Sequence, residues 1–465
     1  MMRSMYSAVS GLRIHQGKMD TIGNNIANVN TVGFKKGQVT FQEVFSQVVR
    51  GASAPAGGKG GTNPQQVGMG AAVGSINTIH TKGPGQRTDN PTDLMIDGEG
   101  FFVVSDDTSF NNRYYTRAGN FSLDRDGNLV TADGFKVLGY AADYDGNIMS
   151  DVTNIKINKS ETKAPTATEL IYFKGNLDSN AKDGENNLID TVVKDSLGNS
   201  YKITFELTKT TNANEWDYKI KRVTDLATGN YSVAVDANGK ETAGPAPGVT
   251  NGMGTLTFND DGKLIKLDGE DLDPKPNPAK IVDFKIDDKI KFNLDKDGKP
   301  ISDAEKKSGT FRTITLFDSE SPDTFKNLTQ YANEMDIKPY AQDGNTSGVL
   351  EGFAIDATGT VEGVFTNGER KALGQIMLAK FDNPMGLQKL GGNFFVDTRN
   401  SGEAQLGKAS TSGFGAISPG NLEMSNVDIS LEFTEMITTQ RGFQANSRII
   451  TTSDEMLQEL VNMKR

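Results

Sequence analysis

Residues 5–28 read MYSAVSGLRIHQGKMDTIGNNIAN, and this stretch decides how the rest of the chain is interpreted. Mostly apolar residues recur in it at alternating spacings of three and four, the pattern of a helix that packs along other helices. The positions are Met5, Ala8, Leu12, His15, Met19, Ile22, Ile26 and, just beyond, Val29. Gly11, Gly17 and Gly23 lie in the same stretch, and each costs about 1 kcal/mol relative to Ala in a helix. The sequence therefore predicts a helix that has a packing seam but is marginal in isolation.

A second helix is predicted at the other end of the chain. Residues 426–463 contain no Pro and one Gly, and Ser425 with Asp428 resembles the start of a capping box. Such a helix would be roughly 50 Å long. Its seam, counted in sevens with the partners in between, consists of Ile429, Phe433, Met436, Gln440, Phe443, Ser447, Ile450, Asp454, Leu457 and Val461. An ordinary amphipathic helix on a globular core is the alternative, but the matching seam at the opposite terminus favours two paired terminal helices.

Composition narrows the class of protein. The chain has 465 residues, of which 35% are hydrophobic and 51 are Gly, and this favours several thin β-rich domains. Its net charge is −11 with no dominant basic patch, which argues against nucleic acid and anionic membranes as partners. There is no Cys, and His15 and His80 are the only histidines, so we expect no disulfide, no metal site and no cofactor. We also expect no cleaved secretory signal and no membrane-spanning segment, because no apolar run is long enough.

Between the two predicted helices the sequence is typical of β-hairpins. A motif of an aromatic residue, an Asp-rich turn and a Gly recurs at residues 121–129, 292–300 and 353–361, and in variant form at 256–264. The turn at 293–298 is not an EF-hand, because Ala304 stands where a bidentate Glu is needed. Residues 51–70 are Gly-rich without periodicity and predict a flexible or loosely wrapped connector. Residues 267–300 are charged and predict the solvated surface of a peripheral domain.

Several segments resemble the axial proteins of the bacterial flagellum, the family of its rod and hook subunits. Residues 24–36 (NNIANVNTVGFKK) are similar to the family signature at the exit of the first helix. Residues 93–104 (DLMIDGEGFFVV) and 117–140 (RAGNFSLDRDGNLVTADGFKVLGY) look like the shared inner β-domain. Residues 425–463 look like the shared C-terminal helix, and together the segments cover roughly half of the chain in collinear order.

The middle of the chain favours the hook branch of this family over the distal rod branch. Residues 191–207 (TVVKDSLGNSYKITFEL), 214–220 (NEWDYKI) and 254–264 (GTLTFNDDGKL) resemble an outer domain that is inserted in hook proteins and that the distal rod protein lacks. The alternatives are the distal rod protein and, less favoured, a non-flagellar surface adhesin. An enzyme is also disfavoured, because the carboxylates concentrate at hairpin turns, where Asp has a local role.

The resemblance implies an α+β fold, mainly β, in a multidomain chain that runs outward and back. Residues 1–30 and 426–465 would be paired coiled-coil-type helices at the inner radius, and residues 31–75 a Gly-rich connecting segment. Residues 76–154 and 336–425 would form a discontinuous inner β-domain, into which an outer β-domain is inserted at 155–335.

The resemblance also implies a function in self-assembly. We expect a homopolymer, a hollow flexible tube that transmits torque from rod to filament and serves as an export channel. The self-assembly seam would be made by Met5, Leu12, Met19, Ile22, Ile26, Ile429, Phe433, Met436, Phe443, Ile450, Leu457 and Val461. The chain would turn at the end of the first helix through Asn24, Asn25, Asn28 and Asn30, whose side chains can bond to nearby backbone.

Further partners are implied by the same resemblance. They are the distal rod protein, the hook cap, the hook–filament junction protein and the flagellar type III export apparatus, which would export the chain to the cell exterior. Phe41 and Phe45 are similar to a motif that docks early substrates at the export gate. A buried strand or helix contact is an equally good interpretation of these two residues.

Overall fold

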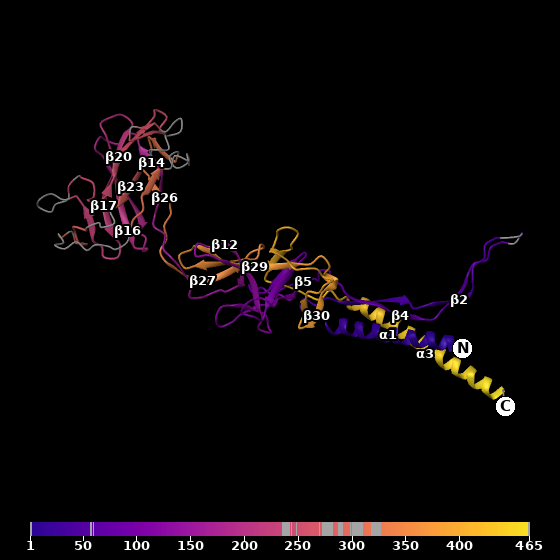
Figure 1. Cartoon of the computed structure of the whole chain (residues 1–465). Helices are drawn as coiled ribbons and strands as arrows, with labels where there is room; N and C mark the ends of the chain where they lie inside the picture. Colours follow the sequence, from indigo (N-terminus) through magenta and orange to yellow (C-terminus); the bar gives the residue numbers. More distant parts are fainter. Residues whose placement is uncertain are drawn as a thin grey trace. The chain divides into compact units, whose positions relative to one another are not determined.

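The structure is a computed structural model of the whole chain. It describes residues 2–55, 58, 60–234, 242, 244–247, 249–268, 270–271, 282–286, 292–297, 299, 310–317 and 327–463. The predicted charged surface at 267–300 therefore lies largely outside the described residues, as do Ala304 and part of the turn at 292–300. The chain forms two compact units (Figure 1). Unit 1 contains Met1–Lys159, Gly352–Val364 and Arg370–Arg465, and unit 2 contains Ser160–Glu351 and Phe365–Glu369.

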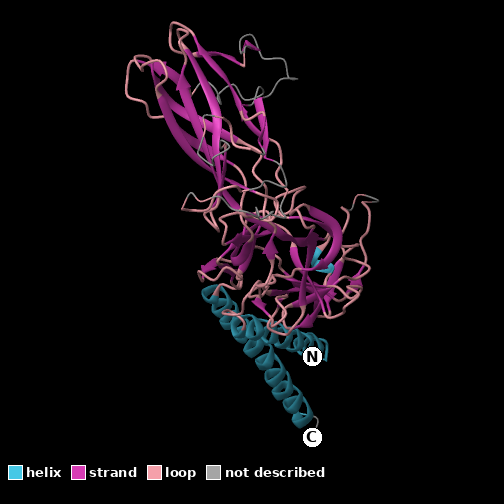
Figure 2. Ribbon diagram, turned by 90° about the vertical axis from the view of Figure 1, so that its left-hand side faces the viewer, coloured by secondary structure: helices cyan, strands magenta, loops and turns pink. Residues whose placement is uncertain are grey.

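Unit 1 contains the two terminal helices. Helix α1 spans Met2–Ala27 and helix α3 spans Ile429–Met463, and they lie side by side in Figures 1 and 2. At the start of α3 the Asp428 carboxylate accepts hydrogen bonds from the backbone N–H groups of Ser430 and Leu431, at 2.9 and 3.2 Å. Asp428 therefore caps the helix, as Asp commonly does at this position. Both predicted helices are confirmed, and the fold is mainly β with helices at its termini.

A two-stranded ribbon follows α1, where the sequence predicted a loosely wrapped connector. Strands β1 (Gly37–Glu43) and β4 (Ala71–Thr78) pair antiparallel, and β2 (Ser46–Arg50) pairs with β3 (Gln65–Gly68) farther along. The Ser10 hydroxyl accepts a hydrogen bond from the Ala71 N–H at 3.3 Å, which places the ribbon along α1. Strand pairing defines this ribbon, which extends through most of the connecting segment predicted at 31–75.

The remainder of unit 1 is a β-body. Its sheet has the strand order β27-β28-β29-β11-β7-β8-β31-β30, with β9, β10, β12 and β32 attached. The bounds are β7 (Phe101–Ser105), β8 (Tyr114–Thr116), β9 (Ser122–Leu123), β10 (Leu129–Val130), β11 (Lys136–Ala142), β12 (Ile148–Asn154), β27 (Gly348–Ile355), β28 (Thr360–Phe365), β29 (Arg370–Lys380), β30 (Gln388–Gly391), β31 (Phe394–Val396) and β32 (Gln405–Lys408). A core that includes Phe101, Tyr115, Met377 and Phe395 lies against this sheet.

Short elements complete the β-body. Strands β5 (Gly85–Arg87) and β34 (Asn421–Glu423) pair antiparallel, and so do β6 (Leu94–Asp97) and β33 (Ala416–Pro419). A single 3₁₀ turn, η1, spans Pro384–Gly386. Strand β34 is therefore the last strand before α3, and it holds the chain in the β-body immediately before the helix begins.

Unit 2 is built from three sheets. The largest has the order β15-β16-β17-β20-β21-β22 with β18 on β17, and the smaller two have the orders β25-β14-β26 and β19-β23-β24. The bounds are β14 (Ile171–Asp178), β15 (Asn186–Lys194), β16 (Ser200–Lys209), β17 (Glu215–Asp225), β18 (Tyr231–Val233), β19 (Val249–Thr250), β20 (Met253–Phe258), β21 (Leu264–Leu267), β22 (Glu270–Asp271), β23 (Val282–Ile286), β24 (Ile314–Phe317), β25 (Leu328–Tyr331) and β26 (Lys338–Gln342). Outside these sheets, β13 (Thr162–Lys163) pairs with the first residues of β27. The predicted domain borders at 154/155 and 335/336 remain predictions, and the two units divide at 159/160 and 351/352.

The predicted hairpin turns at 121–129 and 256–264 are confirmed. Strand β9 pairs with β10, and β20 pairs with β21. In the first turn, hydrogen bonds from Asn128 hold the pKa of the Asp124 carboxyl below its ordinary value. The Asp residues of these motifs therefore accept hydrogen bonds from their own turns, which is the local role expected of Asp there.

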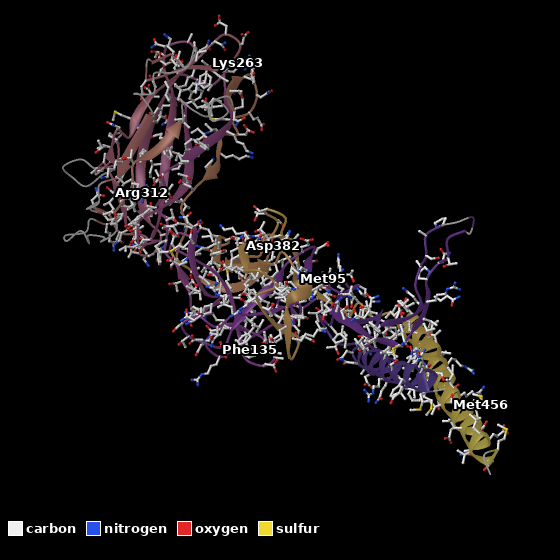
Figure 3. All side chains as sticks on the ribbon, turned by 45° about the vertical axis from the view of Figure 1, so that its right-hand side comes forward. Met95, Phe135, Lys263, Arg312, Asp382 and Met456 are labelled. Atoms are coloured by element: carbon white, nitrogen blue, oxygen red, sulfur yellow. The ribbon has the colours of Figure 1, made fainter. Side chains whose placement is uncertain are left out.

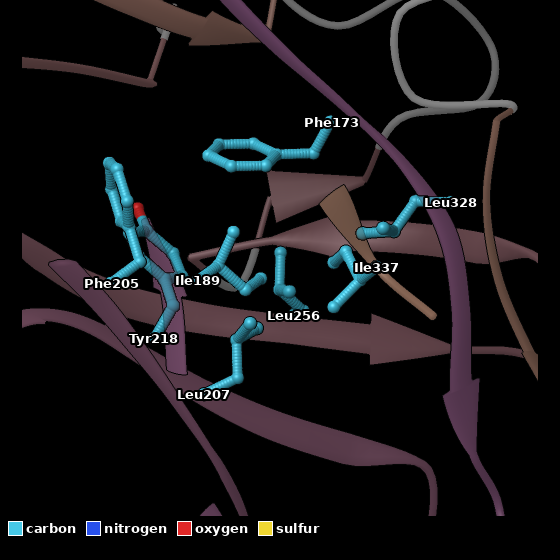
Figure 4. A pocket seen from close by; sticks show the side chains of 8 residues that line it. All are labelled: Phe173, Ile189, Phe205, Leu207, Tyr218, Leu256, Leu328 and Ile337. Carbon is cyan, nitrogen blue, oxygen red and sulfur yellow. The ribbon is translucent and has the colours of Figure 1, made fainter. Parts of the chain in front are cut away.

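The core of unit 2 encloses a small apolar cavity of about 30 Å³ (Figure 4). Its lining is Phe173, Ile189, Phe205, Leu207, Tyr218, Leu256, Leu328 and Ile337. A water molecule held there would need two or more polar partners, and the lining offers only the edge of Tyr218, whose hydroxyl lies 3.4 Å from Asp268. We interpret the cavity as a packing gap and not as a ligand site.

We expect Leu256→Ala to lower the free energy of unfolding of unit 2 by about 2–5 kcal/mol, because it enlarges this cavity. Leu256 is buried, whereas Leu188 is 55% exposed, so Leu188→Ala should change stability by less than about 0.5 kcal/mol. Trp216, the only tryptophan, is fully buried in unit 2, and its fluorescence during chemical denaturation reports this unit. Equal effects of the two substitutions would contradict the prediction.

Candidate functional site

The two terminal helices pair antiparallel. The Lys18 ammonium lies 3.0 Å from the Glu435 carboxylate, and the Asn25 amide donates to the Glu432 carboxylate at 3.1 Å. Farther from the β-body, Gly11 lies against Asn446. Residue numbers therefore rise along α1 as they fall along α3, and the last turns of α3 extend past the start of α1 (Figure 2).

The side of α3 that faces α1 is small and polar. Glu432, Thr439 and Ser453 are the buried residues of α3. A Cβ atom added to Gly442 would lie 2.7 Å from the His15 ring, and one added to Gly11 would lie 2.7 Å from the Asn446 amide. The two helices therefore approach closely through glycine, and the buried residues of α3 are polar, whereas those of α1 include Ala8, Ile14 and Ile22.

The residues of the predicted seam occupy different environments. On α1, Ile22 is buried, whereas Met5, Leu12, Met19 and Ile26 are half-buried. On α3, the residues Met436, Ile450 and Leu457 are half-buried. The remaining seam residues are exposed, with exposed fractions of 44% for Ile429, 48% for Phe433, 38% for Phe443 and 67% for Val461. Their role in self-assembly stays a prediction.

A second apolar stripe on α3 was missed by the sequence analysis. It consists of Leu431, Ile449, Met456 and Leu460, each between 43% and 46% exposed. These positions share one side of the helix because eighteen residues make about five full turns. Met456 lies on the part of α3 near the C-terminus (Figure 3). A search for apolar residues at the helical period of 3.6 residues, in place of the seven-residue repeat, would have found this stripe.

The ribbon also exposes apolar side chains. Phe41 is 40% exposed and Phe45 is 62% exposed, and both their role as an export motif and the alternative of a strand or helix contact stay predictions. The Phe41 ring still approaches the His15 ring, with 6.1 Å between centroids. Val44, Val48, Val49, Val67, Val73 and Ile76 are exposed as well. An isolated two-stranded ribbon is at best marginally stable, so these side chains need a partner surface.

The asparagines at the end of α1 do not act as one group. Asn25 is buried, donates to the Gly37 carbonyl at 2.9 Å and accepts from the Gly37 N–H at 2.9 Å, which ties the helix end to β1. The Asn28 amide bonds to the Asn24 carbonyl and side chain at 2.9 and 2.7 Å. Asn30 is exposed. The predicted role of all four in turning the chain stays a prediction.

A buried ion cluster, which we call the junction cluster, lies where the helices and ribbon meet the β-body. It consists of Lys35, Arg117 and Glu423, whose side chains are 0%, 5% and 0% exposed. The Glu423 carboxylate lies 2.6 Å from the Lys35 ammonium and 3.2 Å from the Arg117 guanidinium. Burial lowers the pKa of Lys35 and of Arg117, while the nearby Glu423 acts in the opposite direction. The sequence analysis missed these residues because ion pairing between distant positions leaves no local pattern.

His80 lies beside this cluster, between the rings of Phe101 and Phe395, with centroid distances of 5.5 and 5.3 Å. Burial, together with the positive charges of Lys35, Arg117 and Lys389, lowers its pKa to about 4. The imidazole is therefore neutral in the folded protein near neutral pH.

Comparison with known proteins places these features in a family. The family model described as "Flagella basal body rod protein" matches residues 5–35, and "Flagellar hook protein FlgE/F/G D1 domain" matches 95–162. "Flagellar basal body protein FlaE D2 domain" matches 156–345, and "Flagellar basal body rod FlgEFG protein C-terminal" matches 418–463. The flagellar hook protein FlgE of Borreliella burgdorferi is 39% identical to this chain over 482 aligned residues, covering all of both chains. The chain belongs to the flagellar hook protein family.

Other relatives agree with this assignment. The hook protein of Treponema pallidum is 36% identical over 484 residues, and the basal-body rod protein FlgG of Bacillus subtilis is 31% identical over 466 residues, each covering all of both chains. The hook relatives are thus more similar than this rod relative. The chain is a structural, non-enzymatic subunit of the flagellar hook, located at the hook and basal body, and it takes part in self-assembly with other flagellar proteins. Among the described residues, no helix has the length and apolar character to cross a membrane.

We expect the stability of unit 1 to decrease on acidification because of His80. Unfolded His has a pKa near 6.5, so the unfolded chain binds a proton between pH 6.5 and about 4 that the folded chain does not bind. The loss should be on the order of 2 kcal/mol between about pH 6.5 and about pH 5. His80→Gln should remove this part and leave the smaller part that comes from His15, whose pKa is also lowered by burial. Trp216 fluorescence reports unit 2, so calorimetry is used to follow the other unfolding transition, that of unit 1, at several pH values. Equal slopes of stability against pH in the wild type and in His80→Gln would refute the prediction.

We expect opposite effects from two Gly→Ala substitutions in the helix pair. Each adds about 1 kcal/mol of helix propensity. A Cβ at Gly17 meets nothing within 4 Å, whereas one at Gly442 would overlap the His15 ring. Gly17→Ala should therefore raise the temperature at which the helical circular dichroism signal is lost, and Gly442→Ala should lower it. An equal rise in both would show that the helices do not pack at Gly442.

Proposed function

We propose that copies of this chain polymerise through α1, α3 and the ribbon into a hollow helical tube, with the helices at the inner radius. The observation that carries the proposal is the set of apolar side chains that a single chain leaves exposed on α3 and on the ribbon. Burying one such side chain in a neighbour contributes about 1.5–3 kcal/mol. Identical contacts repeated head to tail without closure generate a helical polymer.

The same features support ordering of the helices on assembly. Within one chain, α1 and α3 meet through small and polar residues, and three glycines weaken α1 by about 3 kcal/mol relative to Ala. Neighbouring copies supply the missing apolar contacts, so both helices gain order in the polymer. Circular dichroism of the monomer and of the polymer tests this: a monomer that is already fully helical at both ends would refute it.

We assign the polar side of α3 to the channel of the tube. Ser430, Thr434, Arg441, Arg448, Thr452 and Glu459 are exposed and share the side of the helix opposite Thr439, which faces α1. Such a lining stays hydrated and offers few apolar contacts, so it lets unfolded subunits pass on their way to the distal end.

The tube transmits torque from the rod to the filament, and the outer β-domain allows it to bend. Bending requires the outer surfaces of neighbouring subunits to slide between packings of similar energy. Exposed charged pairs such as Lys202 and Asp190, 3.1 Å apart in unit 2, suit such a surface, because each exposed pair contributes about 1 kcal/mol or less.

Partners beyond the polymer follow from the family. The tube would contact the distal rod protein at its base, and the hook cap and the hook–filament junction protein at its tip. The chain would leave the cell unfolded through the flagellar type III export apparatus, without a cleaved signal. Phe41 and Phe45 are the candidate export motif, and their exposure leaves both rings available to a receptor.

We expect Phe433→Ser combined with Ile449→Ser to abolish polymerisation while the monomer stays folded. The two residues lie on the two apolar stripes of α3 and are 48% and 43% exposed, so their replacement leaves the monomer core unchanged. The matched control is Thr434→Ser with Thr452→Ser on the polar side of α3. Electron microscopy measures the yield of tubes. Trp216 fluorescence and circular dichroism show whether the monomer is folded. Tubes of normal yield from the double variant would refute the proposed interface.

The position in the flagellum is tested by immunogold electron microscopy of intact flagella attached to envelopes. The antibody is raised against residues 180–330. Label on the short curved segment outside the cell supports the proposed location. Label confined to the rod inside the envelope would indicate the distal rod protein, and label over the whole cell surface would indicate an adhesin.

A further inference from the structure

Three segments of the chain lie where the helix-and-ribbon part meets the β-body, and we call them the crossings. The crossings are residues 28–36 after α1, residues 79–84 between β4 and β5, and residues 424–428 before α3. The second and third crossings join the two parts covalently, whereas the first links α1 to β1 and contacts the β-body through Gly33 and Lys35. The contacts among them therefore determine whether the two parts move as one.

The junction cluster touches all three crossings through one residue. The Glu423 carbonyl accepts from the Gly33 N–H at 2.7 Å, and its carboxylate pairs with Lys35, so it holds the first crossing. The same carboxylate accepts from the Gly83 N–H at 2.9 Å, and the Lys35 ammonium donates to the Thr81 carbonyl at 2.6 Å, which holds the second. Glu423 itself leads directly into the third crossing.

Other groups fix the cluster to the β-body and to the crossings. The Arg117 guanidinium donates to Glu423 and, at 2.8 Å, to the Gly98 carbonyl. The Asn426 side chain accepts from the Lys36 N–H at 2.8 Å and donates to the Ile79 carbonyl at 2.8 Å. Each crossing thus has at least one hydrogen bond to a different crossing.

The backbone at the crossings is packed without spare room. Gly33 has φ +69°, and a Cβ added there would lie 2.5 Å from the Ala118 nitrogen, next to Arg117. A Cβ added to Gly83 would lie 2.0 Å from the Met424 carbonyl oxygen. Two of the crossings therefore have no lateral freedom as long as Glu423 keeps them in place.

The geometry points to Glu423 as a positioning residue that fixes the three crossings to one another and, through Arg117, to the β-body. The helices and the ribbon then leave the β-body in one set direction, before and independently of any ordering of the helices. In a polymer, which rests on the proposed function, the inner helices and the β-body of one subunit move as a single piece. Bending is then accommodated between subunits.

A nearby ion pair provides a matched control. The Lys82 ammonium and the Asp97 carboxylate are also 2.6 Å apart, but their side chains are 45% and 61% exposed. Loss of an exposed pair changes stability little, whereas removing one partner of a buried pair leaves an uncompensated charge. Asp97→Asn and Glu423→Gln therefore remove equal charges from similar distances in different environments.

The test is hydrogen exchange by mass spectrometry on the full-length monomer, read in peptides covering residues 31–37 and 81–85. We expect slow exchange in the wild type and in Asp97→Asn, and exchange about tenfold faster or more in Glu423→Gln. Peptides from strands β7 and β29 should keep their wild-type rates. Fast exchange at residues 31–37 in the wild type, or an unchanged rate in Glu423→Gln, would overturn the proposal.

A second variant covers the case in which Glu423→Gln unfolds unit 1. Lys35→Met combined with Glu423→Gln removes one positive and one negative charge, so the cluster keeps its net charge. We expect this variant to melt closer to the wild type than Glu423→Gln alone, since one of the two cations left unpaired by the single substitution is gone. A double variant that melts as low as Glu423→Gln would show that charge pairing does not govern the junction.

Polymerisation separates this proposal from the proposed function. If the wild type forms tubes and Glu423→Gln, with a folded monomer, forms few, both proposals stand. If the wild type forms no tubes but exchange at residues 31–37 still depends on Glu423, the proposed function fails and the role of Glu423 stands. If Glu423→Gln forms tubes at normal yield with unchanged exchange, the role of Glu423 is refuted.

Discussion

The close approach of α1 and α3 through small and polar residues is the constraint on which the rest of the molecule depends. Gly442 lies against His15 and Gly11 against Asn446, so the helices approach closely, and the residues that α3 buries are polar. Their larger apolar side chains are left on the flanks, among them Phe433 and Ile449. A single chain cannot satisfy these residues, and further copies of the same chain can.

The junction cluster fixes the direction in which the two terminal helices leave the β-body. Helices that are not held by a core of their own would leave the β-body in many directions. A carboxylate buried with two cations fixes their starting points instead, because a charge in a low-dielectric site holds its partners at defined positions. A buried ion cluster thus lies where the helices meet the β-body, whereas several apolar side chains of α3 are exposed within one chain.

Unit 2 buries many large apolar side chains within the unit itself. Its strand β17 mostly alternates buried and less buried residues, whereas β16 is buried along most of its length, and the core includes Trp216, Tyr201 and Phe205. This unit can fold on its own contacts, and its surface carries exposed ion pairs of low individual energy. A rigid interior under a weakly interacting surface is compatible with outer domains that shift against each other without unfolding.

The sequence by itself determined the elements that are specified by interactions between residues close to one another in the chain. Periodic apolar residues specify the two terminal helices, and Asp-rich turns such as 124–128 specify hairpins, because the interacting groups lie within a few residues of one another. The predicted capping box of Ser425 and Asp428 is replaced by a cap from Asp428 itself, directly before Ile429. Only the tertiary structure decided the ribbon at 37–78, the polar side of α3 that faces α1, and the junction cluster. Lys35 and Glu423 are 388 positions apart, and an interaction between such distant residues exists only once the chain has brought them together and excluded water.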